Sequence, residues 1–341
     1  MKGTYSRKTI EQALGSFRDK RILVIGDVMI DAYLWGKVDR ISPEAPVPVV
    51  SLHKRENRLG GAANVALNIR NLGGIPVLCT FTGKDEKGAL LKTLLKEKGL
   101  DSKGVLASGQ RMTTVKFRII GNNTQMLRVD EETEHPLQEG ETGMLAEKIG
   151  GLIKSGQTDA IVFEDYDKGV IHPGLISQVM EIASQQGIPV AVDPKRKNFL
   201  AYRGVTLFKP NLKELHEGLR LDALPANEDE IRQAVQVLQK KIAAETVLTT
   251  LGNRGIYYRS RKGGQGSQEG FVPGHVRDIS DVSGAGDTVI SLAVLGLAAG
   301  LPTDLMAALC NLGGGIVCEY VGVVPVRLET LKEEALKHLC K

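Results

Sequence analysis

The chain has 341 residues, 42% of them hydrophobic and 25% charged, which fits one large α/β domain with a small appendage. Its 44 Lys and Arg against 40 Asp and Glu give a net charge of +4 without any basic block, which argues against a nucleic-acid-binding protein. The four cysteines form no CxxC pair, and no apolar run has the length of a signal peptide core or a membrane span. We therefore expect a cytoplasmic protein that binds neither nucleic acid nor membrane.

Short apolar runs alternate with stretches of helical periodicity along the chain. The runs predicted as buried parallel strands are 21–26, 76–81, 160–163, 189–192, 206–209 and 246–250. The predicted helices include 63–72, 88–98, 175–186 and 228–244. This alternation predicts an α/β fold with a doubly wound, mostly parallel sheet flanked by helices on both faces.

Two segments, 32–53 and 113–130, interrupt this alternation. Both look extended, and the second has Gly121, Asn122 and Asn123 at a turn position. We expect them to pair as a small β lid outside the main sheet, because ligands of α/β proteins bind beyond the carboxyl ends of the strands. The alternative is a plain surface hairpin or a dimer contact. The chain is predicted to be a single domain, 1–341, that carries these lid segments.

The segment 281–287 (DVSGAGD) precedes a long apolar helical run. The backbone N–H groups of Gly284, Ala285 and Gly286 can converge on an anion, where the helix dipole also favours negative charge. Asp287, on the first turn, is placed to accept the proton of an attacking hydroxyl while the amides stabilise a phosphoryl group in transfer. The alternative is that Asp287 only caps the helix.

A glycine pair, Gly60 and Gly61, opens a second predicted helix, which presents Asn64. Small residues allow a ligand to approach the backbone closely, and Asn64 can donate to and accept from sugar hydroxyls. Asp31, after the first strand, is placed to accept paired hydroxyls of a sugar. The plain alternatives are a tight turn for the glycines and a solvated loop acid for Asp31.

Charged and polar side chains follow the other predicted strands. Five of these side chains place charge at the rim of the sheet: Glu164, Asp165, Lys168, Asp193 and Lys195. The lysines among them are suited to bind phosphate. Asn211 and Glu214 have a spacing that suits either a water-mediated Mg²⁺ site or a helix cap. The segment 249–255 ends a strand in a glycine turn, where a nucleotide can lie against the backbone at Thr250 and Gly255.

With these residues assembled, the chain resembles the ribokinase-like sugar kinases, also called the PfkB family, over nearly its whole length. Its segments DVSGAGD and GGAANVALNIRNLGG are similar to the two signatures of that family and occur in the same order. The resemblance implies a ribokinase-like α/β domain with a small β lid and a sugar kinase that transfers phosphate to a hydroxyl. It also implies ATP and Mg²⁺ as cofactors.

The resemblance further implies roles for individual residues. Asp287 matches the catalytic base, and residues 284–286 match the anion hole. The residues at sugar-contacting positions are Asp31, Gly60, Gly61 and Asn64. Asn211 and Glu214 match the NxxE motif for Mg²⁺ and phosphate. Gly252 and Asn311 fall at positions on the nucleotide side. Asp281 and Ser283 fall at a monovalent cation site, for which K⁺ is the candidate, although Ser283 stands where Thr is common.

Within the family, the substrate-side segments resemble those of kinases that act on D-glycero-β-D-manno-heptose 7-phosphate. The similar segments are ISPEAPVPVV, RLGGAANVA, the DYxKG pattern at 165–169, VDPK and FRIIGNNTQMLRVD. This resemblance implies ATP-dependent phosphorylation of the anomeric hydroxyl to heptose 1,7-bisphosphate, for ADP-heptose and lipopolysaccharide core synthesis. Many relatives carry a fused nucleotidyltransferase domain. Because no HxGH-like motif is present, we expect a stand-alone kinase.

Several cations in or near these segments favour an acceptor that carries a phosphate: Arg58, Lys116, Arg118, Arg128 and Lys168. The alternative is that these side chains form a solvated charged face. The same chemistry on fructose 1-phosphate, tagatose 6-phosphate, ribose or a nucleoside remains open, as does a non-catalytic sugar- or nucleotide-binding protein. A nucleotide-binding redox protein is excluded, because the first strand ends in GDVMID without a G-x-G-x-x-G turn. The family also leads us to expect a homodimer.

Overall fold

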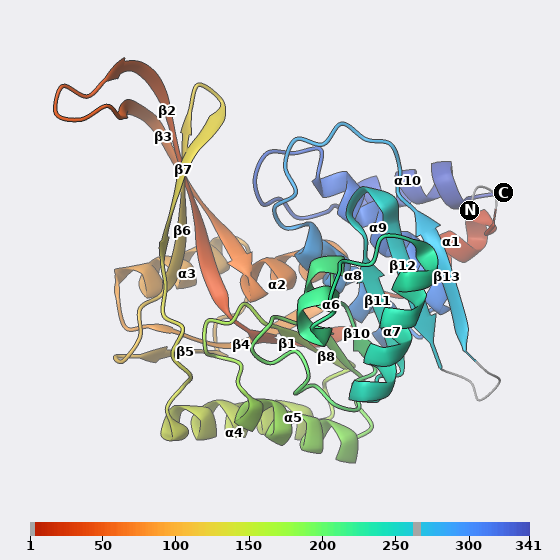
Figure 1. Ribbon diagram of the computed structural model, residues 1–341. Coiled ribbons are helices and arrows are strands. Elements are labelled where there is room, and N and C mark those ends of the chain that lie inside the picture. Colours follow the sequence, from red (N-terminus) through yellow and green to blue (C-terminus); the bar gives the residue numbers. More distant parts are fainter. Residues whose placement is uncertain (1–3, 262–266) are drawn as a thin grey trace.

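The computed structural model describes residues 4–261 and 267–341 (Figure 1). In it the apolar runs form a nine-stranded sheet in the order β13-β12-β11-β10-β9-β8-β1-β4-β5. The pairs from β11 to β5 are parallel, whereas β12 and β13 add an antiparallel edge. The strands are β1 (Arg21–Gly26), β4 (Ile75–Gly83), β5 (Val105–Ser108), β8 (Ala160–Glu164), β9 (Val190–Asp193), β10 (Leu207–Phe208), β11 (Thr246–Thr250), β12 (Gly255–Ser260) and β13 (Gln268–Pro273).

Helices cover both faces of this sheet, because successive side chains of a strand point to opposite faces. In β1, Ile22 and Val24 belong to one apolar core, and Leu23 and Ile25 belong to the other. The helices that pack on the first core are α1 (Arg7–Gly15), α2 (Ala62–Asn71), α3 (Glu86–Glu97), α8 (Ala285–Ala298), α9 (Thr303–Val317) and α10 (Leu328–Leu339). Those on the second are α4 (Glu139–Lys154), α5 (Pro173–Gln185), α6 (Leu212–Leu219) and α7 (Glu228–Ile242). No helix of the described residues is long and apolar enough to cross a membrane.

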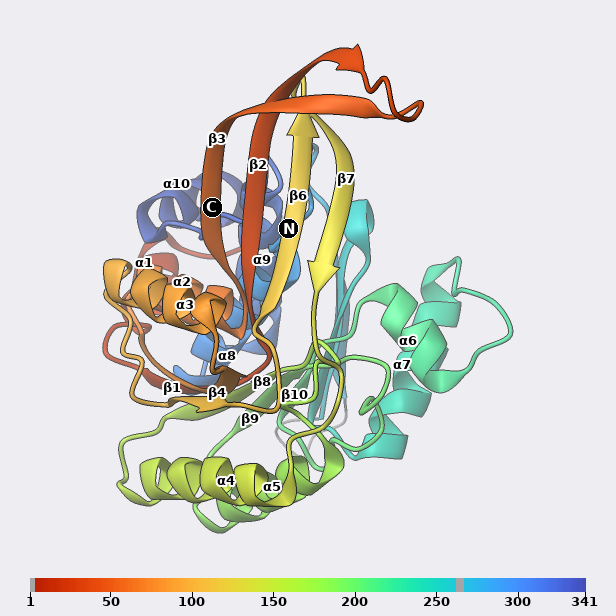
Figure 2. The same ribbon diagram turned by 90° about the vertical axis from the view of Figure 1, so that its left-hand side faces the viewer.

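A second, four-stranded sheet projects from the carboxyl ends of the main strands, and we call it the small sheet (Figures 1 and 2). Its order is β3-β2-β6-β7, with β2 (Val28–Ile41), β3 (Pro48–Gly61), β6 (Thr114–Gly121) and β7 (Thr124–Glu131). Asn122 and Asn123 turn the chain between β6 and β7 with φ values of 51° and 63°, as hairpin turns of this length require. The two interrupting segments therefore pair as predicted, although β2 begins earlier, directly after β1.

The register gives the small sheet two unlike faces, because residues paired across strands point to the same side. One face carries the apolar rows Ala32–Phe117–Val129 and Leu34–Ile119–Leu127. The opposite face carries the charged rows Asp31–Lys116–Asp130 and Tyr33–Arg118–Arg128. We call these the apolar face and the charged face.

Candidate active site

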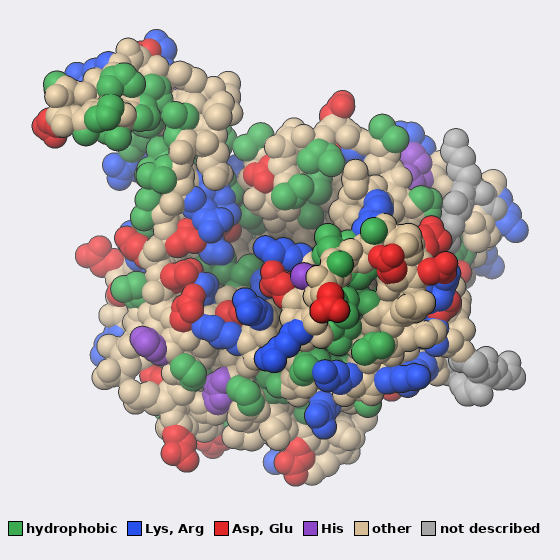
Figure 3. Space-filling model, viewed as in Figure 1, with side chains coloured by type: hydrophobic (Ala, Val, Ile, Leu, Met, Phe, Trp, Pro, Cys, Tyr) green, Lys and Arg blue, Asp and Glu red, His purple; other side chains and the backbone are tan. Residues whose placement is uncertain are grey.

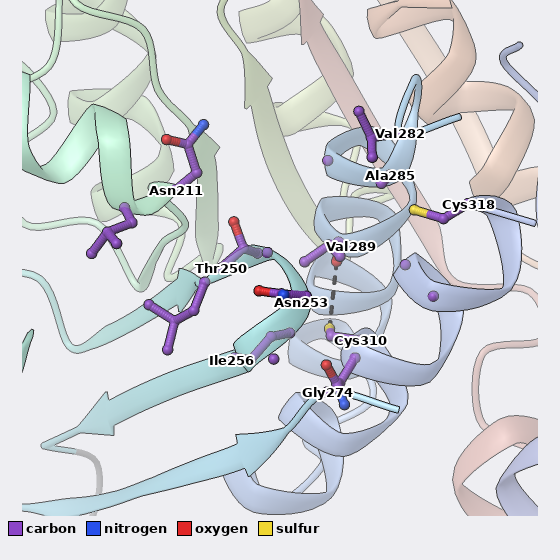
Figure 4. A pocket seen from close by; sticks show the side chains of 18 of the residues that line it. Asn211, Thr250, Asn253, Ile256, Gly274, Val282, Ala285, Val289, Cys310 and Cys318 are labelled. Atoms are coloured by element: carbon purple, nitrogen blue, oxygen red, sulfur yellow. Dashed lines mark hydrogen bonds between the residues drawn. The ribbon is translucent and has the colours of Figure 1, made fainter. Parts of the chain in front are cut away.

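The loops after β9, β10 and β11 and the first turn of α8 line one cavity of about 640 Å³. Figure 4 shows Asn211 and Thr250 on one side of it, and Val289 and Cys310, from α8 and α9, on the other. Its walls are mostly apolar, while one end holds the partly positive amino end of α8 beside Lys195 and Lys209, each of which is paired with one carboxylate. Such a cavity has the chemistry of a site for an anionic ligand with an apolar part.

The amino end of α8 brings together the two glycine motifs that are far apart in the sequence. Gly284, before the helix, has φ 79°, which a residue with a side chain rarely adopts, and an added Cβ would lie 3.2 Å from Asn64 Nδ2. Asp287 is buried, and its Oδ2 accepts a hydrogen bond of 2.7 Å from Asn64 Nδ2. The carboxylate thus has a fixed orientation at the positive end of the helix dipole.

Tyr166 holds the other oxygen of the same carboxylate, and sequence reasoning missed it. Its hydroxyl donates to Asp287 Oδ1 over 2.8 Å. Burial, reinforced by the charge of Asp287, raises the pKa of Tyr166 well above its ordinary value, so the phenol is a donor at neutral pH. The sequence feature that could have indicated Tyr166 is the tyrosine of the DYxKG segment.

Asp27 positions this segment and was also missed. Its carboxylate accepts backbone N–H groups from Tyr166 at 2.9 Å, and from Lys168 and Val170 at 3.0 Å. Burial raises its pKa to about 6, with the charge of Asp165 as a further cause, while the three hydrogen bonds act in the opposite direction. The signal in the sequence was the Gly-Asp pair at the end of the first strand.

Three predicted sugar-side residues lie around Asp287. Asp31 is buried on the charged face of the small sheet and forms an ion pair with Arg118. Burial raises the pKa of Asp31 against the effect of Arg118, and the negative charge of Asp287 adds to this increase. A Cβ on Gly60 would overlap the Asp31 carboxylate, so the glycine is required for that close approach. Gly61 has φ 55° and precedes α2.

Three other predicted substrate residues do not converge on this point. Asp165 is fully buried, and its Oδ2 accepts from Tyr202 at 2.7 Å and from Asn198 at 3.0 Å. These bonds give Asp165 a structural role in support of the loop, and its contact with substrate stays a prediction. Lys168 lies 2.8 Å from Glu132 and 3.2 Å from Glu134. Arg128, on β7, is about half exposed and lies 3.0 Å from Asp130. The sequence could not show these acidic partners.

Two ion pairs lie beneath the glycines before α8. Asp193 and Lys209 are both buried and lie 2.8 Å apart, and Lys195 pairs with Glu214. A Cβ on Gly286 would lie 3.6 Å from both Asp193 Oδ2 and Lys209 Nζ. Burial raises the pKa of Asp193 to about 6 even though the two lysines act against it. Lys209 was not assigned from the sequence.

Asn211 and Glu214 form a helix cap at the start of α6. Asn211 Oδ1 accepts from the Glu214 N–H at 2.8 Å, and Glu214 Oε2 accepts from the Asn211 N–H at 2.9 Å. Both residues also line the cavity. Nearby, Asp193 Oδ1 and Glu164 Oε2 are buried without a partner in the described part of the chain. Unpaired buried carboxylate oxygens are suited to a cation or an ordered water molecule.

The remaining predicted residues lie along the cavity and at its entrance. Those that line it are Thr250, Gly252, Gly255, Ala285 and Asn311, and the short 3₁₀ helix η1 (Gly252–Arg254) forms the glycine turn. The Asp281 carboxylate accepts from Ser283 N at 2.9 Å, from Ser283 Oγ at 2.8 Å and from Gly322 N at 2.9 Å. These bonds fix the loop before α8.

Comparison with known proteins decides the family. The pfkB family carbohydrate kinase profile matches residues 19–330. The chain belongs to this family. It is therefore a sugar kinase, which transfers a phosphoryl group to a hydroxyl, and the expected enzyme class is confirmed.

Curated relatives and solved structures agree with this assignment. The chain is 40% identical over 332 residues to the bifunctional protein HldE of Syntrophotalea carbinolica, covering 97% of this chain and 66% of the relative. It is also 40% identical over 308 residues to HldE of Koribacter versatilis, covering 90% and 61%. The chain thus spans just under two thirds of the length of these relatives.

The solved structures show the fold alone. Phosphofructokinase-2 from Escherichia coli in complex with potassium has a TM-score of 0.75 at 19% identity, covering 93% of this chain and 97% of that one. Ribokinase from Arabidopsis thaliana, complexed with ribose and ATP, has a TM-score of 0.69 at 16% identity, covering 93% and 99%. The predicted ribokinase-like α/β fold is confirmed.

Proposed function

We propose that the protein transfers the γ-phosphoryl group of ATP to the anomeric hydroxyl of D-glycero-β-D-manno-heptose 7-phosphate. The product is heptose 1,7-bisphosphate, an intermediate for ADP-heptose and lipopolysaccharide core synthesis. The observation that carries the proposal is the buried Asp287 carboxylate, held by Asn64 and Tyr166 at the amino end of α8. The choice of acceptor rests on the substrate-side segments and on the similarity to HldE across 97% of the chain.

Asp287 acts as the general base in this proposal. It accepts the proton of the anomeric hydroxyl as that oxygen attacks the γ-phosphorus, and the bond from the phosphorus to the ADP oxygen breaks. The amides of residues 284–286 stabilise the charge on the transferred group. Asp31, Asn64 and the backbone at Gly60 and Gly61 orient the acceptor, and the small sheet closes over it as a lid.

ATP fits the cavity by the chemistry of its lining. The apolar walls at Ile256 and Val289 suit the adenine, and the free N–H groups at the amino end of α8 suit the phosphates. Lys195 and Lys209 lie at the same end, where each would have to share its charge with its carboxylate partner. Thr250, Gly252, Gly255 and Asn311 would then lie beside the nucleoside.

A magnesium ion suits the same end of the cavity. Asn211 and Glu214 would hold it through water, and the unpaired Asp193 Oδ1 gives the carboxylate chemistry that Mg²⁺ prefers. When bound, the ion neutralises charge on the nucleotide phosphates. We place a K⁺ ion at the loop of Asp281 and Ser283. E. coli phosphofructokinase-2, a protein of the same fold, has been solved in complex with potassium.

We also propose that two copies associate through the apolar face of the small sheet. Leu127 and Val129 on this face are 55% and 44% exposed, which is unusual for neighbouring large apolar side chains. A second copy would cover them. The solved relatives include a tetrameric form of E. coli phosphofructokinase-2.

The test of the activity is ADP release with Mg²⁺ and ATP across a panel of acceptors. The panel contains the β and α anomers of D-glycero-D-manno-heptose 7-phosphate, fructose phosphates, tagatose 6-phosphate and ribose. Turnover confined to the β-heptose phosphate supports the proposal, and turnover on another sugar would replace the acceptor. No turnover on any sugar would favour a non-catalytic binding protein.

Asp287→Asn tests the role of the base. The variant should lose roughly 100-fold or more in kcat with little change in KM, because it keeps the shape of the site but cannot accept the proton. Equal turnover in the variant would contradict the assignment.

A further inference from the structure

The five cations of the substrate-side segments have different surroundings. Four of them have fixed partners: Arg118 pairs with Asp31, Arg128 with Asp130, Lys168 with Glu132 and Glu134, and Arg58 donates to the carbonyl oxygens of Val321 and Val323. Lys116 differs from them. Among residues 4–261 and 267–341, its ammonium has no hydrogen-bond or ion-pair partner within the usual distances.

Lys116 lies on β6, on the charged face of the small sheet, in the row Asp31–Lys116–Asp130. Its Nζ is 5.4 Å from the ring centroid of Tyr166, the residue that contacts Asp287. Because β6 belongs to the small sheet, we place this ammonium on the acceptor side of the catalytic carboxylate, whereas Lys195, 5.2 Å from the same ring, lies on the side of the nucleotide cavity. Figure 3 shows the molecule hollowed between the small sheet and the α/β domain, with Lys and Arg side chains along this hollow.

Apart from this cation–π contact with Tyr166, the partly buried ammonium has no hydrogen-bond or ion-pair partner among the described residues, which is an unfavourable arrangement. Burial lowers the pKa of Lys116, and the like charges of Arg128 and Lys168 act in the same direction, against the nearby Asp31 and Asp130. A bound anion would remove this penalty. An ammonium group has three donors and a compact charge, which suits a phosphate.

We propose that Lys116 recognises a phosphate group that the acceptor sugar already carries, and thereby sets the preference for phosphorylated over unphosphorylated sugars. This inference rests on the proposed function only in placing the acceptor beneath the small sheet. Of the five cations that the sequence offered for this phosphate, it selects Lys116 and not Lys168, because the acidic partners of Lys168 already neutralise it. Lys116 is a specificity residue in this role.

The test compares two acceptors that differ only in the phosphate, D-glycero-D-manno-heptose 7-phosphate and D-glycero-D-manno-heptose. Lys116→Met should lower kcat/KM for the phosphorylated sugar by roughly 10- to 100-fold, the effect of a lost charge-assisted hydrogen bond, and leave the value for the unphosphorylated sugar within about 3-fold. Lys116→Arg should restore part of the loss. The matched control is Lys37→Met, since Lys37 lies on the same sheet with its side chain 69% exposed and paired with Asp39.

Calorimetric titration of heptose 7-phosphate without nucleotide gives a readout that does not need turnover. The Kd should rise in Lys116→Met by a similar factor and should not change in Lys37→Met. If the protein turns over no sugar but this Kd still depends on Lys116, the proposed function fails and the Lys116 assignment stands.

Three results would overturn the assignment. Equal losses on both sugars would place Lys116 at the phosphoryl group in transfer rather than at the acceptor phosphate. A larger selective loss in Lys168→Met than in Lys116→Met would return the contact to Lys168. A wild-type protein that neither binds nor phosphorylates any phosphorylated sugar of the panel would contradict both the assignment and the proposed function, whereas activity on a different sugar phosphate would replace the acceptor and move the Lys116 test to that sugar.

Discussion

Two tyrosines near the end of β8 donate hydrogen bonds to aspartates, but the two bonds serve different purposes. Tyr166 donates to Asp287, which lines the cavity, whereas Tyr202 donates to Asp165, which is fully buried beneath the loop. The first bond orients a group that we assign to catalysis. The second satisfies a buried carboxylate, which is costly to leave without donors.

Tyr166→Phe should therefore reduce kcat by roughly 10-fold or more, because a hydrogen bond to a charged group is worth about 1.5–3 kcal/mol. The KM for ATP should change by less than about 3-fold, because phenylalanine keeps the aromatic ring that lines the cavity and loses only the hydroxyl. Steady-state kinetics with the best acceptor of the panel gives both values. An unchanged kcat would show that Asn64 alone orients Asp287.

Tyr202→Phe is the matched control. It should lower the unfolding free energy by about 1–3 kcal/mol, measured by urea denaturation, because Asp165 loses one of its donors. Its kcat should remain within about 2-fold of wild type. A loss of kcat as large as that of Tyr166→Phe would mean that the loop geometry, rather than the bond to Asp287, controls the rate.

Gly60→Ala should impair acceptor binding. The added methyl group would overlap the Asp31 carboxylate and would lie 2.7 Å from Met29 Cγ, so Asp31 must shift. We expect the KM for the acceptor to rise by roughly 10-fold or more, while the KM for ATP stays near wild type. Gly109→Ala is the control, because nothing lies within 4 Å of its added Cβ. An unchanged acceptor KM would remove Asp31 from the acceptor site.

The sequence predicted residues whose role is written into a local pattern, and it missed those whose role depends on distant partners. Asp287, Gly284 and Asn64 belong to glycine motifs that precede helices, so their meeting at one point follows from the fold. Lys209 was missed because nothing near it in the sequence indicates that Asp193 lies 2.8 Å away. The buried partners of Asp165 could not be predicted, because acidity at a strand end does not tell which way the side chain points.

At the scale of elements, buried strands were the most predictable, and helices rich in glycine were the least. The runs at 21–26 and 246–250 match β1 and β11 at both ends. Helix α9 received no bounds from the sequence, because the glycines at 313–315 lower helix propensity. The structure explains them: a Cβ on Gly313 would overlap Leu292, and one on Gly314 would lie 2.9 Å from Val289, so they permit close packing of α8 on α9. The sequence of one helix alone cannot predict such packing against another helix.

Asp27 holds the segment that follows β8, and its titration should make the stability of the protein depend on pH. The pKa of Asp27 is raised from 3.8 to about 6, so the folded state binds the proton more tightly than the unfolded chain. The contribution of Asp27 to the free energy of unfolding is therefore complete below about pH 4 and is lost as the pH rises to about 6. Over this interval the free energy of unfolding should fall by up to about 1.4 kcal/mol per pH unit. Urea denaturation between pH 4 and 6 should show this decrease.

Asp27→Asn provides the comparison for this effect, because an amide does not titrate. The unfolding free energy of the variant should fall less steeply over the same interval than that of the wild type, whatever its absolute stability. Identical slopes would mean that the three N–H donors keep Asp27 ionised in the folded state throughout this range.

At the scale of the whole molecule, the sequence predicted the layers but not the order of the strands. Alternating strands and helices predict a parallel sheet covered by helices, yet β1 lies between β8 and β4, a neighbour relation that no local pattern records. That order places the ends of β1 and β8 beside each other, and so brings Asp27 to the segment that carries Tyr166. The site therefore depends on topology as much as on motifs.

The small sheet should determine the oligomeric state, because its two faces differ so strongly. Light scattering coupled to chromatography should give about twice the chain mass of 36.8 kDa for the wild type. Leu127→Lys and Val129→Lys place charge on the apolar face and should give the monomer mass, because a buried unpaired charge opposes association. Arg128→Gln is the control: Arg128 lies between them in the sequence but points to the opposite face, so this variant should remain a dimer. Dissociation by all three variants would mean that they disturb the hairpin itself, and a monomeric wild type would leave the apolar face to some other occupant.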